Sequence, residues 1–343
     1  MTGPDACIAG VGTALPGEPV GNGTLARRFG VNEEWIDAFI GTRTRHFALD
    51  LATGRRTHSL TDLCEQAAER ALAAAGTRPE EVDFVVLGTA TPDHLIPTTA
   101  NLLAGRLGID GVPTYQLQSG CAGAVQAFDV AARFLAGDDF ETCLVLGGDV
   151  CAKHLDVERD YSALPPEELI NLTLFGDGAG AAVVTRRPRA ERTLIRRVLN
   201  RVSGTDRAPG QIIEWFGVAD RDSGARAAAE DYKAIEEHVP GMTAETVWEL
   251  AEDAGWPLDT IDFLLPPQLS GRMTERIVKE LSLPIAGEVS CVTETGNNGN
   301  ALPFHQLERL LKEMRPGQRA LCVAIESSQW IRTGLAVEKV PPC

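Results

Sequence analysis

The sequence predicts an α/β protein built from two duplicated halves. Apolar runs of about 4 to 8 residues rich in Val, Ile and Leu alternate with segments of helical periodicity such as 122–136, a pattern typical of parallel strands buried on both faces. The 343 residues, 44% hydrophobic and 23% charged, suffice for one large or two mid-sized domains with a buried core. We place the two halves at 1–185 and 186–343.

A helix, a turn and a buried strand occur twice in the same order. In the first copy CEQAAERALAAAG leads through TRPEE into VDFVVLG, and in the second ETVWELAEDAG leads through WPLDT into IDFLLPP. Asp262 follows Asp83 by 179 residues, and Gly255 follows Gly76 by the same number. Because the register holds across the turn, a real duplication is favoured over the general similarity of strand-helix-strand units.

A second landmark supports the same duplication. The apolar run TCLVLGGD at 142–149 matches RALCVAIES at 319–327, with Leu144 opposite either Leu321 or Cys322. The offset differs from the first one by one or two residues, which is what small changes in loop length produce. Each half therefore contains at least two corresponding strands.

Composition excludes several classes of protein. With 48 Asp and Glu against 32 Lys and Arg, the net charge is −16, and the overall field repels nucleic acid and anionic membranes. We find neither a run of about 18 apolar residues nor the basic-then-apolar order of a signal peptide, and we expect a cytoplasmic protein without membrane contact. The eight cysteines form no C-x-x-C pair, so neither a metal nor a permanently bound cofactor is expected.

One cysteine occupies a position suited to chemistry. In YQLQSGCAGAV a strand ends in a Ser-Gly turn, Cys121 follows, and a helix begins with small residues. The unpaired N–H groups and the dipole of a helix N-terminus favour a thiolate, which predicts a lowered pKa for Cys121. Its backbone N–H is also placed to bind an oxyanion. Cys121 is thus either a nucleophile or a small buried side chain.

Four segments together resemble the β-ketoacyl-acyl-carrier-protein synthase III family of the thiolase-like fold. The resemblance covers nearly the whole chain, and its most specific parts are the Cys121 turn and the GDGAG stretch. It implies a five-layered αβαβα fold of two similar halves, a homodimer built across the first-half sheet, and an acyl group carried on Cys121. The matching segments are NEEWIDAFIGTRTRHF at 32–47, GTATPDHLIPTTANLLAGRLGI at 88–109, 117–125 and LFGDGAGAAVV at 174–184.

Three motifs of the second half can be compared with the family, and two of them differ in this sequence. The family's catalytic His lies in a Pro-His-Gln-Ala-Asn run, but here Pro267 stands where the His belongs, followed by Gln268. The family's Asn is matched by Asn297. The family's Gly-rich loop, whose backbone N–H completes the oxyanion hole, is replaced by bulkier residues that begin at Glu326. Loss of one oxyanion donor typically costs about 10²–10³ in rate, so decarboxylating chain extension is expected to be inefficient.

Several residues are candidates for the missing proton acceptor. Glu326 and Glu294 flank the second-half loops and would be bases if burial raised their pKa values. Gln268 carries an amide, which orients a substrate rather than deprotonating it. His305 falls on a helix of apolar periodicity and is expected to be packed or exposed rather than catalytic.

Further positions are matched to the substrate mouth. The resemblance implies that Trp35, Arg43 and Arg272 hold coenzyme A or pantetheine, and an aromatic face beside Arg suits a nucleotide. The alternative for each is an ordinary surface role. The segment 204–232 mixes Gly, Asp and Arg without a clean period, and we expect loops and short strands near the mouth there.

These observations predict an acyltransferase of specialised metabolism. An acyl-CoA or acyl-carrier-protein thioester would load Cys121, which passes the acyl group to a hydroxyl or amine of a small molecule, with Cys121, Asn297, Gln268 and Glu326 as the catalytic set. Two alternatives stay open: a carbon-carbon bond-forming condensing enzyme, and a silent partner of a heterodimeric ketosynthase.

Overall fold

The computed structural model describes residues 6–164, 166–187, 192–214, 228–283 and 287–341. Within these ranges the main sheet has strand order β12-β11-β13-β14-β8-β1-β7-β6-β4-β5. The first-half strands are β1 (Cys7–Ala14), β4 (Phe84–Gly88), β5 (Thr114–Leu117), β6 (Thr142–Asp149) and β7 (Gly178–Thr185). The second-half strands are β8 (Arg192–Val202), β11 (Phe263–Leu265), β12 (Gly287–Glu288), β13 (Arg319–Glu326) and β14 (Ile331–Val340).

The two sets of strands have the same topology. In the first half β4 pairs in parallel with β5 and β6, and β7 runs antiparallel to β6 and β1. In the second half β11 pairs in parallel with β12 and β13, and β14 runs antiparallel to β13 and β8. This identity of order and direction confirms the duplicated α/β halves, while the boundary at 185/186 stays a prediction.

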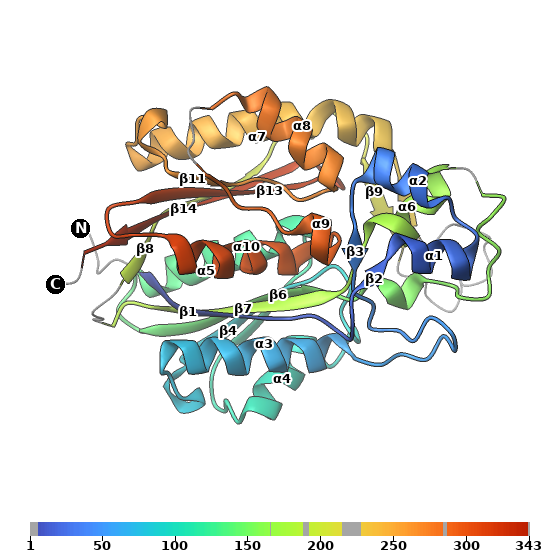
Figure 1. Ribbon diagram of the computed structural model, residues 1–343. Helices are drawn as coiled ribbons and strands as arrows, with labels where there is room; N and C mark the ends of the chain where they lie inside the picture. Colours follow the sequence, from blue (N-terminus) through green and yellow to red (C-terminus); the bar gives the residue numbers. More distant parts are fainter. Residues whose placement is uncertain (1–5, 165, 188–191, 215–227, 284–286, 342–343) are drawn as a thin grey trace.

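The halves are joined along a short seam. Strands β1 and β8 pair only at Cys7 with Leu194 and at Ile8 with Thr193. Beyond this seam the two sets of strands separate, and helices fill the space between them (Figure 1). The sheet therefore behaves as two layers that share one edge.

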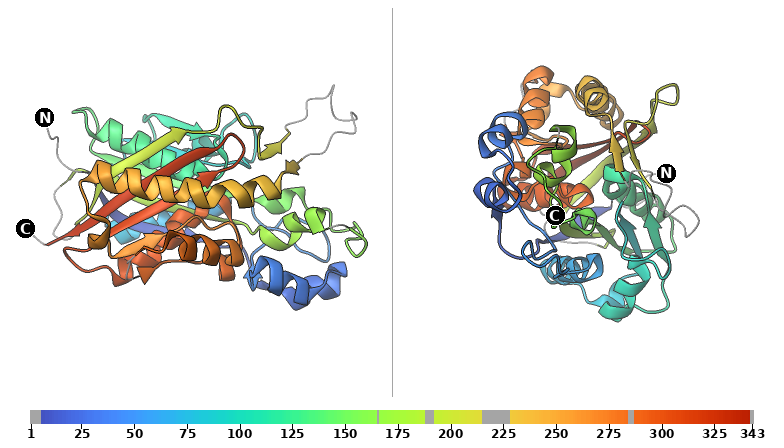
Figure 2. Two further views of the ribbon diagram at one scale, coloured as in Figure 1. Left: turned by 90° about the horizontal axis from the view of Figure 1, so that it is seen from above. Right: turned by 90° about the vertical axis from the view of Figure 1, so that its right-hand side faces the viewer.

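Helices complete a five-layered αβαβα arrangement, as expected (Figure 1). Helices α3 and α4 cover the outer face of the first-half strands, α5 and α10 lie in the middle, and α7 and α8 cover the second-half strands. Figure 2 shows α7 running along the length of the molecule. The helices are α3 (Leu60–Ala75), α4 (Thr99–Leu107), α5 (Gly123–Leu135), α7 (Tyr232–Ala254), α8 (Gly271–Leu281) and α10 (Leu302–Glu313).

The central layer is apolar on both sides. Phe128 of α5 stacks on Phe304 of α10 with ring centroids 5.5 Å apart, and both belong to a core that includes residues of both sets of strands. Helices buried on all sides carry apolar residues around most of their circumference, which explains the run AVQAF in α5. The predicted helix over 122–136 is confirmed.

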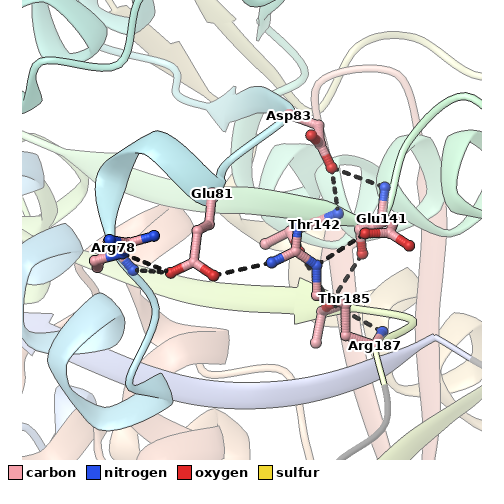
Figure 3. Close-up of polar contacts among 7 residues, drawn as sticks. All are labelled: Arg78, Glu81, Asp83, Glu141, Thr142, Thr185 and Arg187. Carbon is pink, nitrogen blue, oxygen red and sulfur yellow. Dashed lines mark hydrogen bonds and ion pairs between the residues drawn. The ribbon is translucent and has the colours of Figure 1, made fainter.

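Repeated hydrogen bonds account for the repeated sequence. Asp83 donates its N–H to the carbonyl of Thr142 at 2.9 Å and accepts the Thr142 N–H at 2.8 Å (Figure 3). Asp262 makes the same pair of bonds with Arg319, at 3.0 and 2.9 Å. Each Asp thus fixes the start of the neighbouring parallel strand, so the pattern DFVV or DFLL has a structural reason.

Strand register decides a point that the sequence left open. Val85 lies opposite Leu144, and Leu264, which follows Val85 by 179 residues, lies opposite Leu321. Leu144 therefore corresponds to Leu321 and not to Cys322. Gly76 and Gly255 correspond as well, because both end a helix in the left-handed region, at φ 58° and 69°, where glycine is favoured.

Smaller elements gather at one end of the layers, on the right of Figure 1. Residues 22–47 and 152–174 share a separate apolar core there. Among the described residues, no helix is both long enough and apolar enough to cross a bilayer. These smaller elements are β2 (Val20–Gly21), α1 (Asn22–Phe29), α2 (Glu33–Trp35), η1 (Ile36–Ile40), β3 (Thr44–Arg45), η4 (Cys151–His154), α6 (Pro166–Leu174), β9 (Gln211–Ile213) and β10 (Ala228–Glu230).

Candidate active site

Cys121 lies on a short turn between a strand and the central helix. The turn η3 (Gly120–Ala122) connects β5 to the N-terminus of α5. Gly120 has a φ of 50°, and a side chain there would overlap the carboxyl group of Glu326. A glycine is therefore required before Cys121, both for the backbone conformation and for the approach of Glu326.

Glu326 places its carboxylate directly on this turn. It is the last residue of β13 and is 1% exposed. Its Oε2 accepts the backbone N–H of Cys121, and its Oε1 accepts the backbone N–H of Ser328 at 2.7 Å. The sequence analysis expected the Cys121 N–H to bind an oxyanion, and Ser328 lies in the loop that replaces the family's Gly-rich loop. In this chain the Glu326 carboxylate accepts both N–H groups.

The charges of the site correct one expectation. Burial, and next the carboxylate of Glu326, raise the pKa of the Cys121 thiol well above its ordinary value. The prediction of a lowered pKa was wrong, because desolvation and a neighbouring negative charge oppose thiolate formation. Burial also raises the pKa of Glu326, although two backbone N–H bonds favour its charged form. Burial and the neighbouring Glu326 carboxylate therefore favour the thiol form of Cys121.

A cavity of about 40 Å³ lies beside Cys121. Pro267 and Asn297 both line it. The position matched to the family's imidazole therefore lies beside Cys121, but the proline there offers neither a hydrogen-bond donor nor a base. Asn297 is 6% exposed and accepts the Gly299 N–H at 3.1 Å through Oδ1. Its amide nitrogen has no protein partner among the described contacts, which leaves a donor for a substrate oxygen.

Gln268 lines the same cavity, but its side chain is already bonded. Its Oε1 accepts the N–H groups of Cys291 and Val292 at 2.7 and 2.9 Å, and its Nε2 donates to Ser290 at 3.0 Å. The amide thus holds the start of α9 (Val292–Thr295). We propose that Gln268 positions this loop instead of orienting the substrate as predicted.

Glu294 does not belong to the site. It forms ion pairs with Arg309 at 2.6 Å and Arg43 at 3.4 Å, and its side chain is half exposed. Glu294 is therefore held at the surface by two arginines and does not line the Cys121 cavity. His305 is buried and burial lowers its pKa to about 3, as expected for a packed and neutral imidazole.

A second carboxylate near Cys121 escaped the sequence analysis. Glu230 ends the short strand β10 and accepts the Gln211 amide N–H at 2.7 Å. Gly210, next to Gln211, donates its N–H to the carbonyl of Ser327 at 3.0 Å, which ties this ribbon to the loop after Glu326. Burial, and then the charge of Glu326, raise the pKa of Glu230. No periodicity distinguishes Glu230 from other acidic residues, so no sequence pattern identifies it.

The three predicted substrate-mouth residues lie near one another. Arg272 donates to the carbonyls of Asp37 and Ala38 at 3.2 Å each, in the turn that follows Trp35. Trp35 stacks on Phe39 with centroids 6.0 Å apart. Arg43 is 70% exposed and pairs with Glu294, and Arg272 pairs with Glu275 at 3.1 Å. Their binding role stays a prediction.

The described residues contain no group of His, Cys, Asp and Glu suited to hold a metal ion. Cys121 is a free thiol. What this site offers is therefore a thiol, the buried carboxyl of Glu326, the partly buried carboxyl of Glu230, two backbone N–H groups directed at Glu326 and an amide donor. These groups suit acyl transfer through a covalent thioester.

Comparisons with known proteins agree with this chemistry. The model of 3-oxoacyl-[acyl-carrier-protein (ACP)] synthase III matches 115–202, and its C-terminal model matches 251–327. The chain is 30% identical over 297 residues to the beta-ketoacyl-[acyl-carrier-protein] synthase III of Neisseria meningitidis, covering 86% of each. The enzyme of the same name from Xanthomonas oryzae pv. oryzae is 31% identical over 300 residues, again covering 86% of each. The chain belongs to this family of condensing enzymes.

Solved structures show the same fold. The synthase III from Pseudomonas aeruginosa, at 25% identity, superposes with a TM-score of 0.83 and covers 98% of each chain, which confirms the thiolase-like fold. A protein described as "AbyA1 - tetronic acid condensing enzyme" is 56% identical, with a TM-score of 0.94, and the match covers 97% of this chain and 99% of that one. The transferase class is thereby established, and the bond that is formed is considered next.

Proposed function

We propose that this chain builds a tetronic acid ring by condensing two thioesters without losing CO2. The 56% identity to AbyA1 over nearly the full length supports this reaction class. So does the replacement of the family's His by Pro267, which removes a donor for a decarboxylation enolate. The setting would be specialised metabolism, as the sequence analysis expected.

The ring itself defines the two substrates. Tetronic acid is a five-membered lactone whose carbonyl, central carbon and enol carbon lie in a row. One ester bond and one carbon-carbon bond close it from an acyl thioester with a hydroxyl on its α-carbon and a 3-oxoacyl thioester. Two thiols leave and every carbon is retained. The α-carbon of a 3-oxoacyl thioester lies between two carbonyls and is already acidic, so no decarboxylation is needed to make the carbanion.

In the first step the donor loads Cys121. The thiol gives its proton to the Glu326 carboxylate, and the sulfur attacks the thioester carbon of the donor. A neutral carboxyl group accepts hydrogen bonds more weakly than a carboxylate, so proton transfer frees the N–H groups of Cys121 and Ser328 for the substrate oxyanion. As the tetrahedral intermediate collapses, the carbon-sulfur bond of the donor breaks and its thiolate takes the proton from Glu326.

In the second step the carbon-carbon bond forms. Glu326, again ionised, removes a proton from the α-carbon of the 3-oxoacyl thioester, and the resulting carbanion attacks the Cys121 thioester. Asn297, which lines the same cavity as Cys121, would donate its amide N–H to the enolate oxygen. Cys121 leaves as a thiol, taking the proton held by Glu326. The donor hydroxyl then attacks the remaining thioester, whose thiol carries away the hydroxyl proton and leaves the lactone.

The observation that carries this mechanism is the Glu326 carboxylate on the Cys121 and Ser328 N–H groups. It supplies a base to a site without an imidazole and couples thiol deprotonation to the opening of the oxyanion hole. The acyl group on Cys121 passes to carbon in this mechanism and not to the hydroxyl or amine first expected from the sequence, although an ester bond forms when the ring closes. The carbon-carbon bond corresponds to the first of the two alternatives left open by the sequence, a condensing enzyme.

The test uses S-lactoyl and S-acetoacetyl pantetheine as probes, with Cys121→Ala as control. We expect a lactoyl mass gain on the wild-type protein that is absent from the control, followed by release of 3-acetyl-5-methyltetronic acid and two thiols. A malonyl thioester should release no CO2. A linear ester that retains a thioester would reduce the function to O-acylation, and the absence of an acyl-enzyme with any donor would favour a silent partner.

Two expectations about partners accompany this proposal. A carrier protein or coenzyme A would present the donors at the mouth formed by Trp35, Arg43 and Arg272. We also propose a homodimer through the first-half sheet, since β5 forms the edge of that sheet and Ile96 nearby is 89% exposed. Exposed strand edges and large apolar side chains are typical of interfaces.

A further inference from the structure

Asn300 reaches from the second half of the molecule to the Cys121 turn. It lies in η6 (Gly299–Ala301), directly before α10, and is completely buried. Its Oδ1 accepts the backbone N–H of Ala124 at 2.7 Å, and its Nδ2 donates to the carbonyl of Gly120 at 2.9 Å. Gly120 precedes Cys121 and Ala124 lies in the first turn of α5. One amide therefore holds the chain on both sides of the nucleophile.

Asp149 determines which way this amide points. At the end of β6, its Oδ2 accepts both the backbone N–H and the Nδ2 of Asn300, at 2.9 and 2.8 Å. Its Oδ1 accepts bonds from Thr89, Ala90 and Thr91 at 2.8 to 3.1 Å. Because a carboxylate that only accepts must face the NH2 group of an asparagine, the amide oxygen is directed to Ala124.

Close packing of two glycines against Asn300 and Asp149 keeps these side chains in place. A Cβ at Gly123 would lie 2.9 Å from the Asn300 oxygen, and one at Gly299 would overlap the Asp149 carboxylate. Both glycines therefore allow backbone to approach these side chains closely. The contact is also independent of Glu326, which binds the Cys121 N–H from another element.

We propose that Asn300 is the positioning residue of Cys121, and that Asp149 fixes its orientation. The amide holds the turn so that the Cys121 N–H stays directed, together with the Ser328 N–H, at the position of the Glu326 carboxylate, where the substrate oxygen would develop its charge. This inference rests on the part of the proposed function in which Cys121 is the acylated nucleophile. It assigns a task to the third Asn of the loop Gly296–Asn300.

Asn298 provides a matched control. It is an asparagine in the same loop, equally buried, and neither of its side-chain polar atoms has a hydrogen-bond partner in the structure. Asn300→Ala and Asn298→Ala therefore remove the same group from the same loop, but only the former releases the Cys121 turn. Loss of folding stability alone should affect both variants.

The experiment measures single-turnover acylation of Cys121 by S-lactoyl pantetheine, followed by intact mass, with melting temperature recorded for each variant. We expect Asn300→Ala to lower the saturating acylation rate by about 10²-fold, the effect of a displacement near 1 Å, with little change in the half-saturating donor concentration. Asn298→Ala should stay within about threefold of wild type. Equal rates in the two variants would overturn the inference.

Asn300→Asp adds a readout that a purely structural role would not move. Its carboxylate would face the carboxylate of Asp149, the titratable group in contact with it, so repulsion should be relieved as pH falls and one of the pair is protonated. We expect the acylation rate of this variant, relative to wild type, to recover at low pH, and a pH-independent ratio would contradict us. If wild-type protein forms no acyl-enzyme at all, the proposed function fails and this inference fails with it, a result distinct from equal rates in two active variants.

Discussion

The carboxylate of Glu326 accepts the backbone N–H of Cys121 across the boundary between the two halves, although 205 residues separate them. Glu326 thereby lies where the oxygen of a bound thioester should go. In the proposed mechanism the base and the oxyanion hole are two states of this one contact. Variants of Glu326 should therefore affect the reactivity of the Cys121 thiol and the binding of a substrate oxyanion differently.

Replacement of Glu326 by Gln should slow acylation of Cys121 by about 10²-fold or more, since general base catalysis contributes about 10²–10⁴. An amide of the same size takes no proton, and its single oxygen can accept only one of the two N–H groups that the carboxylate binds with separate oxygens. Single-turnover acylation followed by intact mass measures this effect. Glu294→Gln, on the surface, serves as control, and similar losses in both variants would refute the role of Glu326.

The same variant should react faster with iodoacetamide. The Glu326 charge is the second cause, after burial, of the raised pKa of Cys121, so its removal lowers that pKa and increases the thiolate fraction at a given pH. Alkylation needs no oxyanion hole. We therefore expect alkylation of Cys121 to rise while acylation falls, and a parallel loss of both would show that Glu326 merely supports the fold.

Glu230 should act as a proton relay when the lactone closes, giving its proton to the leaving thiolate and taking up the hydroxyl proton in return. Burial and the charge of Glu326 raise the pKa of Glu230, which favours a protonated carboxyl beside an ionised one. Glu230→Gln should lower the condensation rate by about 10²-fold, with the loss most evident at low pH, where wild-type Glu230 is protonated. Product formation against pH measures this, and Glu237→Gln, exposed on α7, should behave like wild type.

Stability should also depend on a buried carboxyl outside the site. Burial raises the pKa of Asp177 to about 7 from 3.8, although it accepts the N–H groups of Ala48 and Ala152 at 2.6 and 3.0 Å. Because the folded form binds the proton more tightly, the stability linked to Asp177 is complete below pH 3.8 and is lost as pH rises to about 7.

Melting temperature against pH tests this linkage. As pH rises from about 4 to about 8, the unfolding free energy of wild type should lose a contribution that Asp177→Asn lacks, so the melting temperature of wild type should fall relative to that of the variant. A constant difference between wild type and variant would mean that Asp177 is ionised in the folded protein throughout this range.

Much of the fold followed from local patterns. The offset between Asp83 and Asp262 predicted the duplication because each Asp fixes a neighbouring strand through the same two bonds. The Cys121 turn was located by its small residues and the helix behind it. Substitution of the family's His by Pro267 was visible directly, and it turned attention to an alternative base.

The choice between bases was beyond the sequence. Glu326 and Glu294 both follow second-half elements, yet one is buried on Cys121 and the other pairs with Arg43 and Arg309 at the surface. Gln268 looked like a substrate ligand, but its amide binds Cys291 and Val292. These differences depend on the direction of a side chain, which periodicity does not encode.

By itself the sequence determined the alternation of strands and helices, the duplicated halves and the cysteine at a helix N-terminus, since each depends on residues near one another in the chain. Only the tertiary structure decided the electrostatics of the site. The sign of the pKa shift of Cys121 depends on burial and on Glu326, which arrives when the end of β13 is brought against the turn before α5. A local pattern describes the dipole of one helix, whereas the free energy of a charge depends on everything packed around it.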